Sequence, residues 1–124
     1  MEQPEYINMN SILHEVRLER QSQDLKWGTQ THPSVDLILQ EQGRTGQRMC
    51  EEYELPSEDR AKQMCDIHSE RGDLTWAHIA VEEMSEVVAA KDDSQRREEL
   101  VQLAAIVVAW IESIDRNTKD ENNS

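Results

Sequence analysis

Aromatic side chains are scarce in this chain of 124 residues, which has three Trp, two Tyr and no Phe. Its core volume therefore has to come mainly from aliphatic side chains, and hydrophobic residues of all kinds make up only 36%. The length suits one small domain, which we expect to span residues 1–124. Because a small acidic chain of this composition buries little apolar surface alone, we expect it to complete its core as a homodimer or higher homo-oligomer.

Basic residues are also in short supply, since 13 Lys and Arg stand against 26 Asp and Glu, giving a formal net charge of −13. A surface with this charge repels nucleic-acid phosphates, so no nucleic acid is expected as a partner. The charged partners that the composition favours are cations.

Cysteines and long apolar segments are rare as well. Cys50 and Cys65 are too few for a disulfide framework and lack the spacing of a zinc site, so we expect reduced thiols and a cytoplasmic location. Residues 1–10 show no basic region followed by an apolar run, and no signal peptide is predicted. The longest apolar stretch, Leu100–Ile111, is shorter than the roughly 20 residues that cross a bilayer, so no membrane partner is expected.

The spacing of apolar residues is helical and predicts an all-α fold, a bundle of about four helices. Ser57 and Gly72 have the side chains expected at the start and just past the end of one of them. Residues 29–56 are predicted as a loop-rich insertion with one helical turn, and residues 117–124 as a disordered tail. The expected helices run from Asn10 or Ser11 to about Lys26, from about Glu58 to Arg71, from a cap at Asp73 or Thr75 to about Lys91, and from Ser94 to roughly Asn117.

The last of these helices is apolar around nearly its whole circumference over Leu100–Ile111. A helix of this kind has to be covered on more than one side. We therefore expect it to pack on the preceding helix of its own chain and also on a second subunit.

Acidic residues occupy positions on both sides of the turn predicted at Asp92 and Asp93. Glu82, Glu83 and Glu86 lie within about one helical turn, and Glu83 interrupts an apolar stripe. A hairpin centred on that turn places Glu86 opposite Glu99, and Glu83 opposite Gln102. Carboxylates gathered beside apolar residues have to take up protons or bind cations, and oxygen ligands suit Mg²⁺ or Mn²⁺. The alternative is a solvated acidic helix face, which is what most charge runs form.

The segment Glu83-Met-Ser-Glu86, followed after twelve residues by Glu99-Leu-Val-Gln102, resembles the ExxE…ExxD signature of the MazG-like all-α NTP pyrophosphohydrolases. The apolar flanks of both halves, together with Glu19–Gln30, resemble the small MazG-like proteins of bacteria and their phages. The resemblance covers most of the chain apart from Val35–Leu55 and the tail.

This resemblance implies a helical bundle, dimeric or larger, in which Mg²⁺ activates water to split a nucleoside triphosphate (NTP or dNTP) into a monophosphate and pyrophosphate. It implies that Glu83, Glu86 and Glu99 are metal ligands, with Gln102 at the fourth position of the motif. Glu82 is then the candidate base that orients the attacking water. Gln102 departs from the usual Asp, and its uncharged amide oxygen predicts weaker binding of the ion.

Three further residues are candidates for substrate binding. Lys26 and Trp27 combine a cation with a flat aromatic face, which suits contact with a phosphate and a base. Lys62, on the second predicted helix, is a candidate for a phosphate contact. The alternative is that Trp27 seals the end of a helix and that both lysines are simply solvated.

Two functions follow from these residues. The first is a Mg²⁺-dependent nucleotide pyrophosphohydrolase that acts as a homo-oligomer. The alternative is a catalytically weakened helical dimer, which binds nucleotides or a protein partner and has lost full metal ligation at Gln102.

Overall fold

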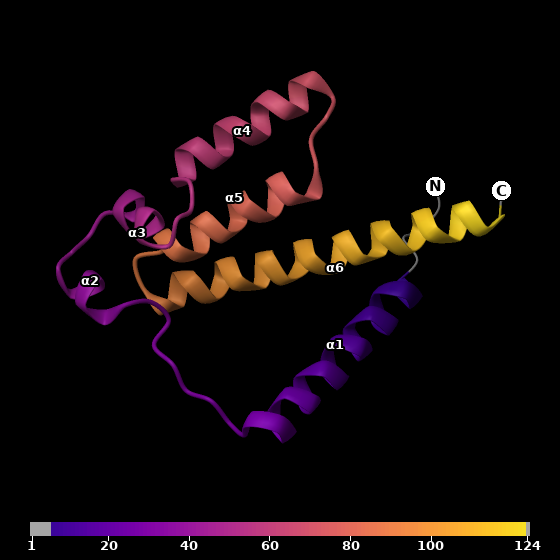
Figure 1. The fold of residues 1–124 in the computed structure, drawn as a ribbon, viewed down its shortest axis with the longest axis horizontal. Coiled ribbons are helices and arrows are strands. Elements are labelled where there is room, and N and C mark those ends of the chain that lie inside the picture. The colour runs from indigo at the N-terminus through magenta and orange to yellow at the C-terminus, as the bar shows by residue number, and fades with distance from the viewer. Residues whose placement is uncertain (1–5, 124) are drawn as a thin grey trace. The chain divides into compact units, whose positions relative to one another are not determined.

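The computed structural model describes the backbone of residues 6–123 and the side chains of residues 8–118. In that part of the chain every regular element is an α-helix (Figure 1), so the predicted all-α class is confirmed. There are six helices in place of the expected four or so. They are α1 (Tyr6–Trp27), α2 (Leu37–Glu41), α3 (Gly46–Glu52), α4 (Glu58–Arg71), α5 (Trp76–Ala89) and α6 (Asp93–Asn123).

The helices belong to two compact units. One unit contains residues 1–32 and 107–124, and the other contains residues 33–106. Helix α6 contributes its first part to the second unit and its remainder to the first. The expectation of one domain over residues 1–124 stays a prediction.

In the first unit, α1 begins at Tyr6, earlier than the cap expected at Asn10 or Ser11. It ends as predicted before Gly28, whose φ of 71° suits glycine and whose N–H donates to the Asp24 carbonyl at 2.7 Å. At the other end of this unit, α6 continues to Asn123, past the end expected near residue 117. The side chains of the tail from residue 119 on lie outside the described residues.

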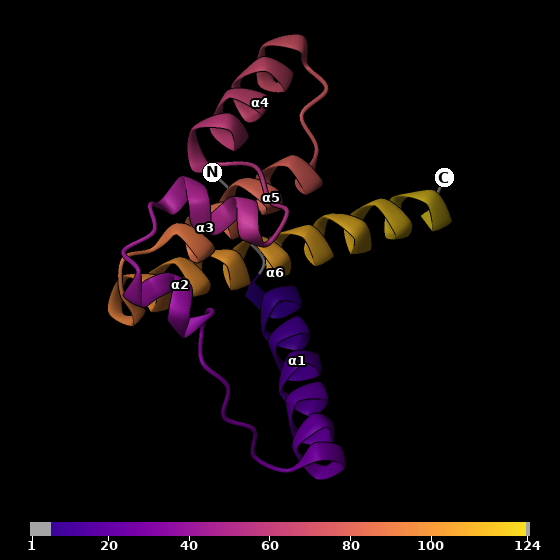
Figure 2. The same ribbon diagram turned by 60° about the vertical axis from the view of Figure 1, so that its left-hand side comes forward.

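In the second unit, α4 and α5 form an antiparallel pair (Figure 2), and local capping sets their ends. The Ser57 hydroxyl accepts from the Arg60 N–H at 3.1 Å, and Gly72 follows the helix with a φ of 78°. Thr75 caps α5 by accepting from the His78 N–H, while the Thr75 N–H donates to the His78 ring. The boundaries predicted for α4 are confirmed, and of the two caps expected for α5, Asp73 and Thr75, the structure has Thr75.

The segment predicted as loop-rich contains two short helices, so its expected single helical turn is wrong. Asp36 caps α2 and Thr45 caps α3, each by accepting a backbone N–H through its side chain. Helix α3 then buries Met49 and Cys50 in a cluster with Val88 of α5. Helices of five and seven residues are too short to show a helical period, and tertiary packing stabilises them.

The turn between α5 and α6 is held by Arg96, which is only 3% exposed. Its guanidinium donates from Nε to the Val87 carbonyl at 3.0 Å and from Nη2 to the Ala90 carbonyl at 2.8 Å. It also pairs with Asp93 at 2.6 Å. These bonds satisfy carbonyls at the end of α5 and fasten the start of α6 against it. The expected extension of α5 to about Lys91 is therefore wrong by two residues.

Gly46 of α3 packs closely against Ala89 of α5. A methyl group at Gly46 would lie 2.9 Å from the Ala89 Cβ, inside ordinary van der Waals contact. We expect Gly46→Ala to lower the free energy of unfolding by about 1–2 kcal/mol, because crowding outweighs the gain in helix propensity. Urea denaturation measures the change. Gln47→Ala, at the next and exposed position, is the control and is expected to stay within about 0.5 kcal/mol; equal stability of both variants would contradict the close packing.

Candidate metal centre

Helices α5 and α6 bring Glu83, Glu86 and Glu99 together. One carboxylate oxygen from each lies within 4.8 Å of the other two. Glu83 and Glu86 are one turn apart on α5, and the Arg96 bonds across the turn hold α6 beside them. The expectation that these three side chains converge across a hairpin is thus confirmed.

The cluster is more deeply buried than an acidic patch on a protein surface. Glu83 is only 7% exposed, and Glu86 and Glu99 are partly buried. Glu83 Oε1 and Glu99 Oε2 are both buried and have no hydrogen-bond partner among the described residues. Because buried carboxylates without donors are strongly disfavoured, the solvated-face alternative does not describe Glu83.

The proton affinity of the cluster reflects this burial. Burial raises the pKa of Glu83 to about 8, with smaller contributions from hydrogen bonding to Glu99 and Glu86 and from their negative charges. Burial also raises the pKa of Glu86, where the charge of Glu99 acts in the same direction. A proton on Glu83 supplies the donor that the ionised cluster lacks, so the cluster retains a proton near neutral pH.

Glu58, which the sequence analysis named only as the expected start of a helix, is a further acidic neighbour at the start of α4. Burial raises its pKa, as do the charges of Asp59 and Glu99. Its carboxylate therefore lies close enough to Glu99 to contribute to the field of the cluster. No spacing rule links α4 to α6, so only the tertiary structure could place Glu58 here.

Comparisons with protein-family models, with curated proteins and with solved structures found no match.

Glu82, the expected base, lies on α5 and is partly buried. The Cys65 thiol of α4 donates to the His78 carbonyl at 3.4 Å, and burial, followed by the influence of the nearby Glu82, raises the pKa of Cys65 to about 11. The negative charge of Glu82 also raises the pKa of Glu86, so Glu82 lies next to the cluster. Its role as a base stays a prediction.

The remaining candidates are exposed. Gln102 is on α6, one turn beyond Glu99, and Lys62 is on α4. Lys26 and Trp27 end α1 in the first unit, with the Lys26 Nζ 4.7 Å from the centre of the Trp27 ring. This contact is a cation–π pair that occupies both side chains locally.

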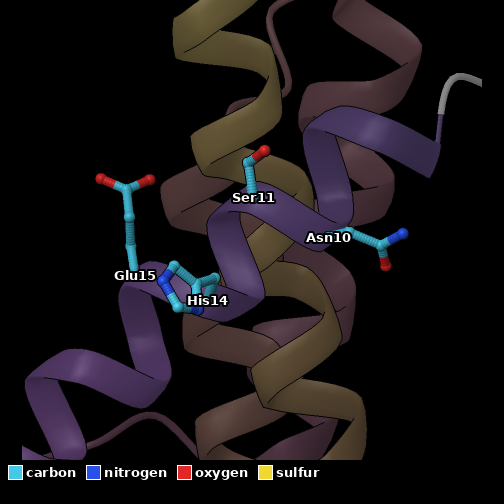
Figure 3. A pocket seen from close by; sticks show the side chains of 4 residues that line it. All are labelled: Asn10, Ser11, His14 and Glu15. Carbon is cyan, nitrogen blue, oxygen red and sulfur yellow. The ribbon is translucent and has the colours of Figure 1, made fainter.

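A hollow of about 530 Å³ lies along α1 and contains none of the glutamates of the cluster. Asn10, Ser11, His14 and Glu15 line it, and all four are exposed. Figure 3 shows the Asn10 amide and the Glu15 carboxylate pointing in different directions, so these polar groups do not converge on one ligand.

Among the described residues, no helix combines the length and the apolar character that a membrane span requires.

The raised pKa of Glu83 predicts how stability depends on pH in the absence of metal. A carboxyl that holds its proton more tightly when folded stabilises the fold at low pH, and this contribution is lost as pH rises through about 8. Between pH 5 and 9, in chelator, we expect the unfolding free energy of the natural chain to fall relative to Glu83→Gln by a few kcal/mol at most, at ~1.4 kcal/mol per pKa unit.

Urea denaturation at a series of pH values provides the measurement. Glu98→Gln, at an exposed position of α6, is the matched control and should follow the natural chain. Parallel curves for the natural chain and Glu83→Gln would show that Glu83 is not protonated in the fold.

Proposed function

We propose that this chain is a Mg²⁺-dependent nucleoside triphosphate pyrophosphohydrolase of the MazG-like kind, which acts as a cytoplasmic homo-oligomer. The observation that carries the proposal is the pair of buried, unpartnered oxygens, Glu83 Oε1 and Glu99 Oε2, within a cluster of three carboxylates. The resemblance of the ExxE…ExxQ pattern to the MazG-like signature supports the choice of reaction.

The donor set fits a hard divalent cation. Three carboxylates offer only oxygen, which suits Mg²⁺ or Mn²⁺ and disfavours ions that prefer nitrogen or sulfur. The two orphaned oxygens are acceptors that a cation would satisfy, and its positive charge would remove the need for a proton on Glu83. We assign Glu83, Glu86 and Glu99 as the ligands, with Gln102 as a fourth.

The chemistry needed is addition of water to the α-phosphorus, with breakage of the α–β anhydride bond and departure of pyrophosphate. When bound, Mg²⁺ supplies neutralisation of phosphate charge and acidification of water. Glu82 is assigned to orient the water and accept its proton. The apolar surroundings of Glu83 keep bulk water out and strengthen the electrostatic interactions of the ligands.

Surfaces beyond the cluster support the expected partners. Val81, Met84, Leu100 and Val101, on α5 and α6, are exposed large apolar residues, and a second copy of the chain would cover them. Lys62, in the same unit as the cluster, is proposed as a phosphate contact, and Lys26 and Trp27 of the first unit stay candidates for contact with a nucleotide. Both cysteines are free thiols, which agrees with a reducing compartment.

Hydrolysis is tested by incubating the protein with a panel of NTPs and dNTPs, with Mg²⁺ or with chelator, and measuring pyrophosphate and monophosphate. We expect release that requires Mg²⁺ and falls at least ~100-fold in Glu83→Gln, because one charged ligand is lost. Glu98→Gln controls for the loss of one negative charge on the same pair of helices. Equal release by Glu83→Gln and the natural chain would contradict the assignment.

Gln102→Asp tests the fourth position of the motif. If residue 102 contacts the ion, a carboxylate there should tighten Mg²⁺ or Mn²⁺ binding in a calorimetric titration, because a charged oxygen replaces a neutral one. An unchanged titration would exclude residue 102 from the ligands.

The uncharged Gln102 also favours a second candidate function. A site with one fewer negative charge than the usual motif binds its ion more weakly. The chain would then act as a dimer that binds nucleotides or a protein partner without turnover. Nucleotide binding by calorimetry together with no pyrophosphate release from any substrate would support this function over the hydrolase.

A further inference from the structure

A second pocket, of about 270 Å³, lies between the connection from α2 to α3 and the turn from α5 to α6. Its volume is near the lower end of the ~300–1,000 Å³ typical of small-molecule sites. Among the described residues that line it, three are cationic and none is acidic. In a chain where acidic residues outnumber basic ones 26 to 13, this local excess of positive charge is unusual. The cations are Arg44, Lys91 and Arg96.

Arg96 brings a buried guanidinium to the pocket, and the exposed carboxylate of Asp93 pairs with it at 2.6 Å. The bonds of Arg96 to Val87, Ala90 and Asp93 use one N–H on each of its three nitrogens, and a guanidinium has five N–H groups. Two donors therefore remain. The same bonds neutralise carbonyl groups at the end of α5 that would otherwise repel an anion.

Arg44 and Lys91 supply mobile charge at the edge of the pocket, since both are exposed. Arg44 has one weak side-chain bond, from Nε to Gln42 at 3.4 Å. A planar guanidinium matches two phosphate oxygens at once, and a lysine ammonium adds a point charge. This donor set suits a phosphate group better than a neutral ligand.

The pocket adjoins the glutamate cluster along both helices. Ala89 lies three residues after Glu86 on α5, and Arg96 lies three residues before Glu99 on α6. Residues at this spacing share a helix face, with a rise of about 4.5 Å along the axis. The pocket residues Ala89 and Arg96 are thus one turn from the glutamates, while Lys91 lies in the turn between the two helices and Arg44 in the connection from α2 to α3.

Gly46, at the start of α3, lies next to both the pocket and Glu58. It lines the pocket, and a Cβ built there would lie 3.4 Å from Glu58 Oε1. Burial raises the pKa of Glu58, and so do the charges of Asp59 and Glu99, so Glu58 lies near the pocket through Gly46 and near the cluster through Glu99.

We infer that this pocket is a phosphate-binding site, in which Arg44, Lys91 and Arg96 hold the pyrophosphate end of a nucleotide whose α-phosphate lies at the glutamates. The placement of the nucleotide rests on the proposed function, whereas the affinity of the pocket for phosphate does not. An acidic chain that binds a polyphosphate needs a local positive site to offset its overall repulsion, and this pocket supplies it.

The test is a titration of the full chain with inorganic pyrophosphate in chelator, followed by amide chemical shifts in NMR spectra. We expect the shifts to gather at Arg44, Thr45, Ala90 and Lys91. In the double variant Arg44→Gln, Lys91→Gln the dissociation constant should rise at least ~10-fold, because two charge-assisted contacts are lost. Arg48→Gln, which removes one positive charge at an exposed position of α3 outside the lining, is the control and should stay within about twofold.

Three results would overturn the inference: an unchanged constant in the double variant, shifts confined to residues outside the pocket, or equal shifts with succinate, which would show a general anion effect. Glu83→Gln separates this inference from the proposed hydrolysis, since it should abolish turnover and leave pyrophosphate binding intact. Binding that survives in Glu83→Gln and fails in the double variant supports the pocket even if the natural chain releases no pyrophosphate from NTPs.

Discussion

Three carboxylates lie close together in a buried space with few hydrogen-bond donors, and the rest of this structure depends on that constraint. Glu83 is nearly inaccessible to solvent, and oxygens of Glu83 and Glu99 lack any partner among the described residues. Burying such groups opposes folding, so a small chain with little core to spare would not retain them for stability. A proton relieves the repulsion near neutral pH, and a divalent cation would relieve it more completely, since it satisfies several oxygens at once.

The charges of the second unit are arranged in layers along α5 and α6. The acidic layer contains Glu83, Glu86 and Glu99, and the next turn of α6 toward the loop contains Arg96, beside a pocket that Lys91 of the loop and Arg44 also line. Arg96 has two roles in this arrangement. It fastens the two helices together through its hydrogen bonds, and its guanidinium lines the pocket. A substrate with several anionic groups in a row and a bound cation would complement this order of charges. An elongated polyanion such as nucleic acid would instead be repelled by the rest of the chain, which has a net charge of −13.

How far the sequence predicts this arrangement depends on how local each feature is. The caps at Ser57 and Thr75 and the convergence of Glu86 with Glu99 follow from neighbouring residues and from one tight turn, so they could be inferred from spacing alone. Helices α2 and α3 could not, because α3 is held by packing on α5 and α2 contributes only Leu39 to the edge of the same apolar cluster. The approach of Glu58 to Glu99 and the bonds of Arg96 depend on tertiary placement, for which helical periodicity carries no signal.

The central claim is that the carboxylate cluster is a site for one divalent cation or more. Anomalous X-ray scattering from crystals grown with Mn²⁺, measured on both sides of the manganese absorption edge, tests it most directly. The account predicts an anomalous peak within direct coordination distance of carboxylate oxygens from Glu83, Glu86 and Glu99. Well-ordered crystals with saturating Mn²⁺ and no peak at these three residues would contradict it.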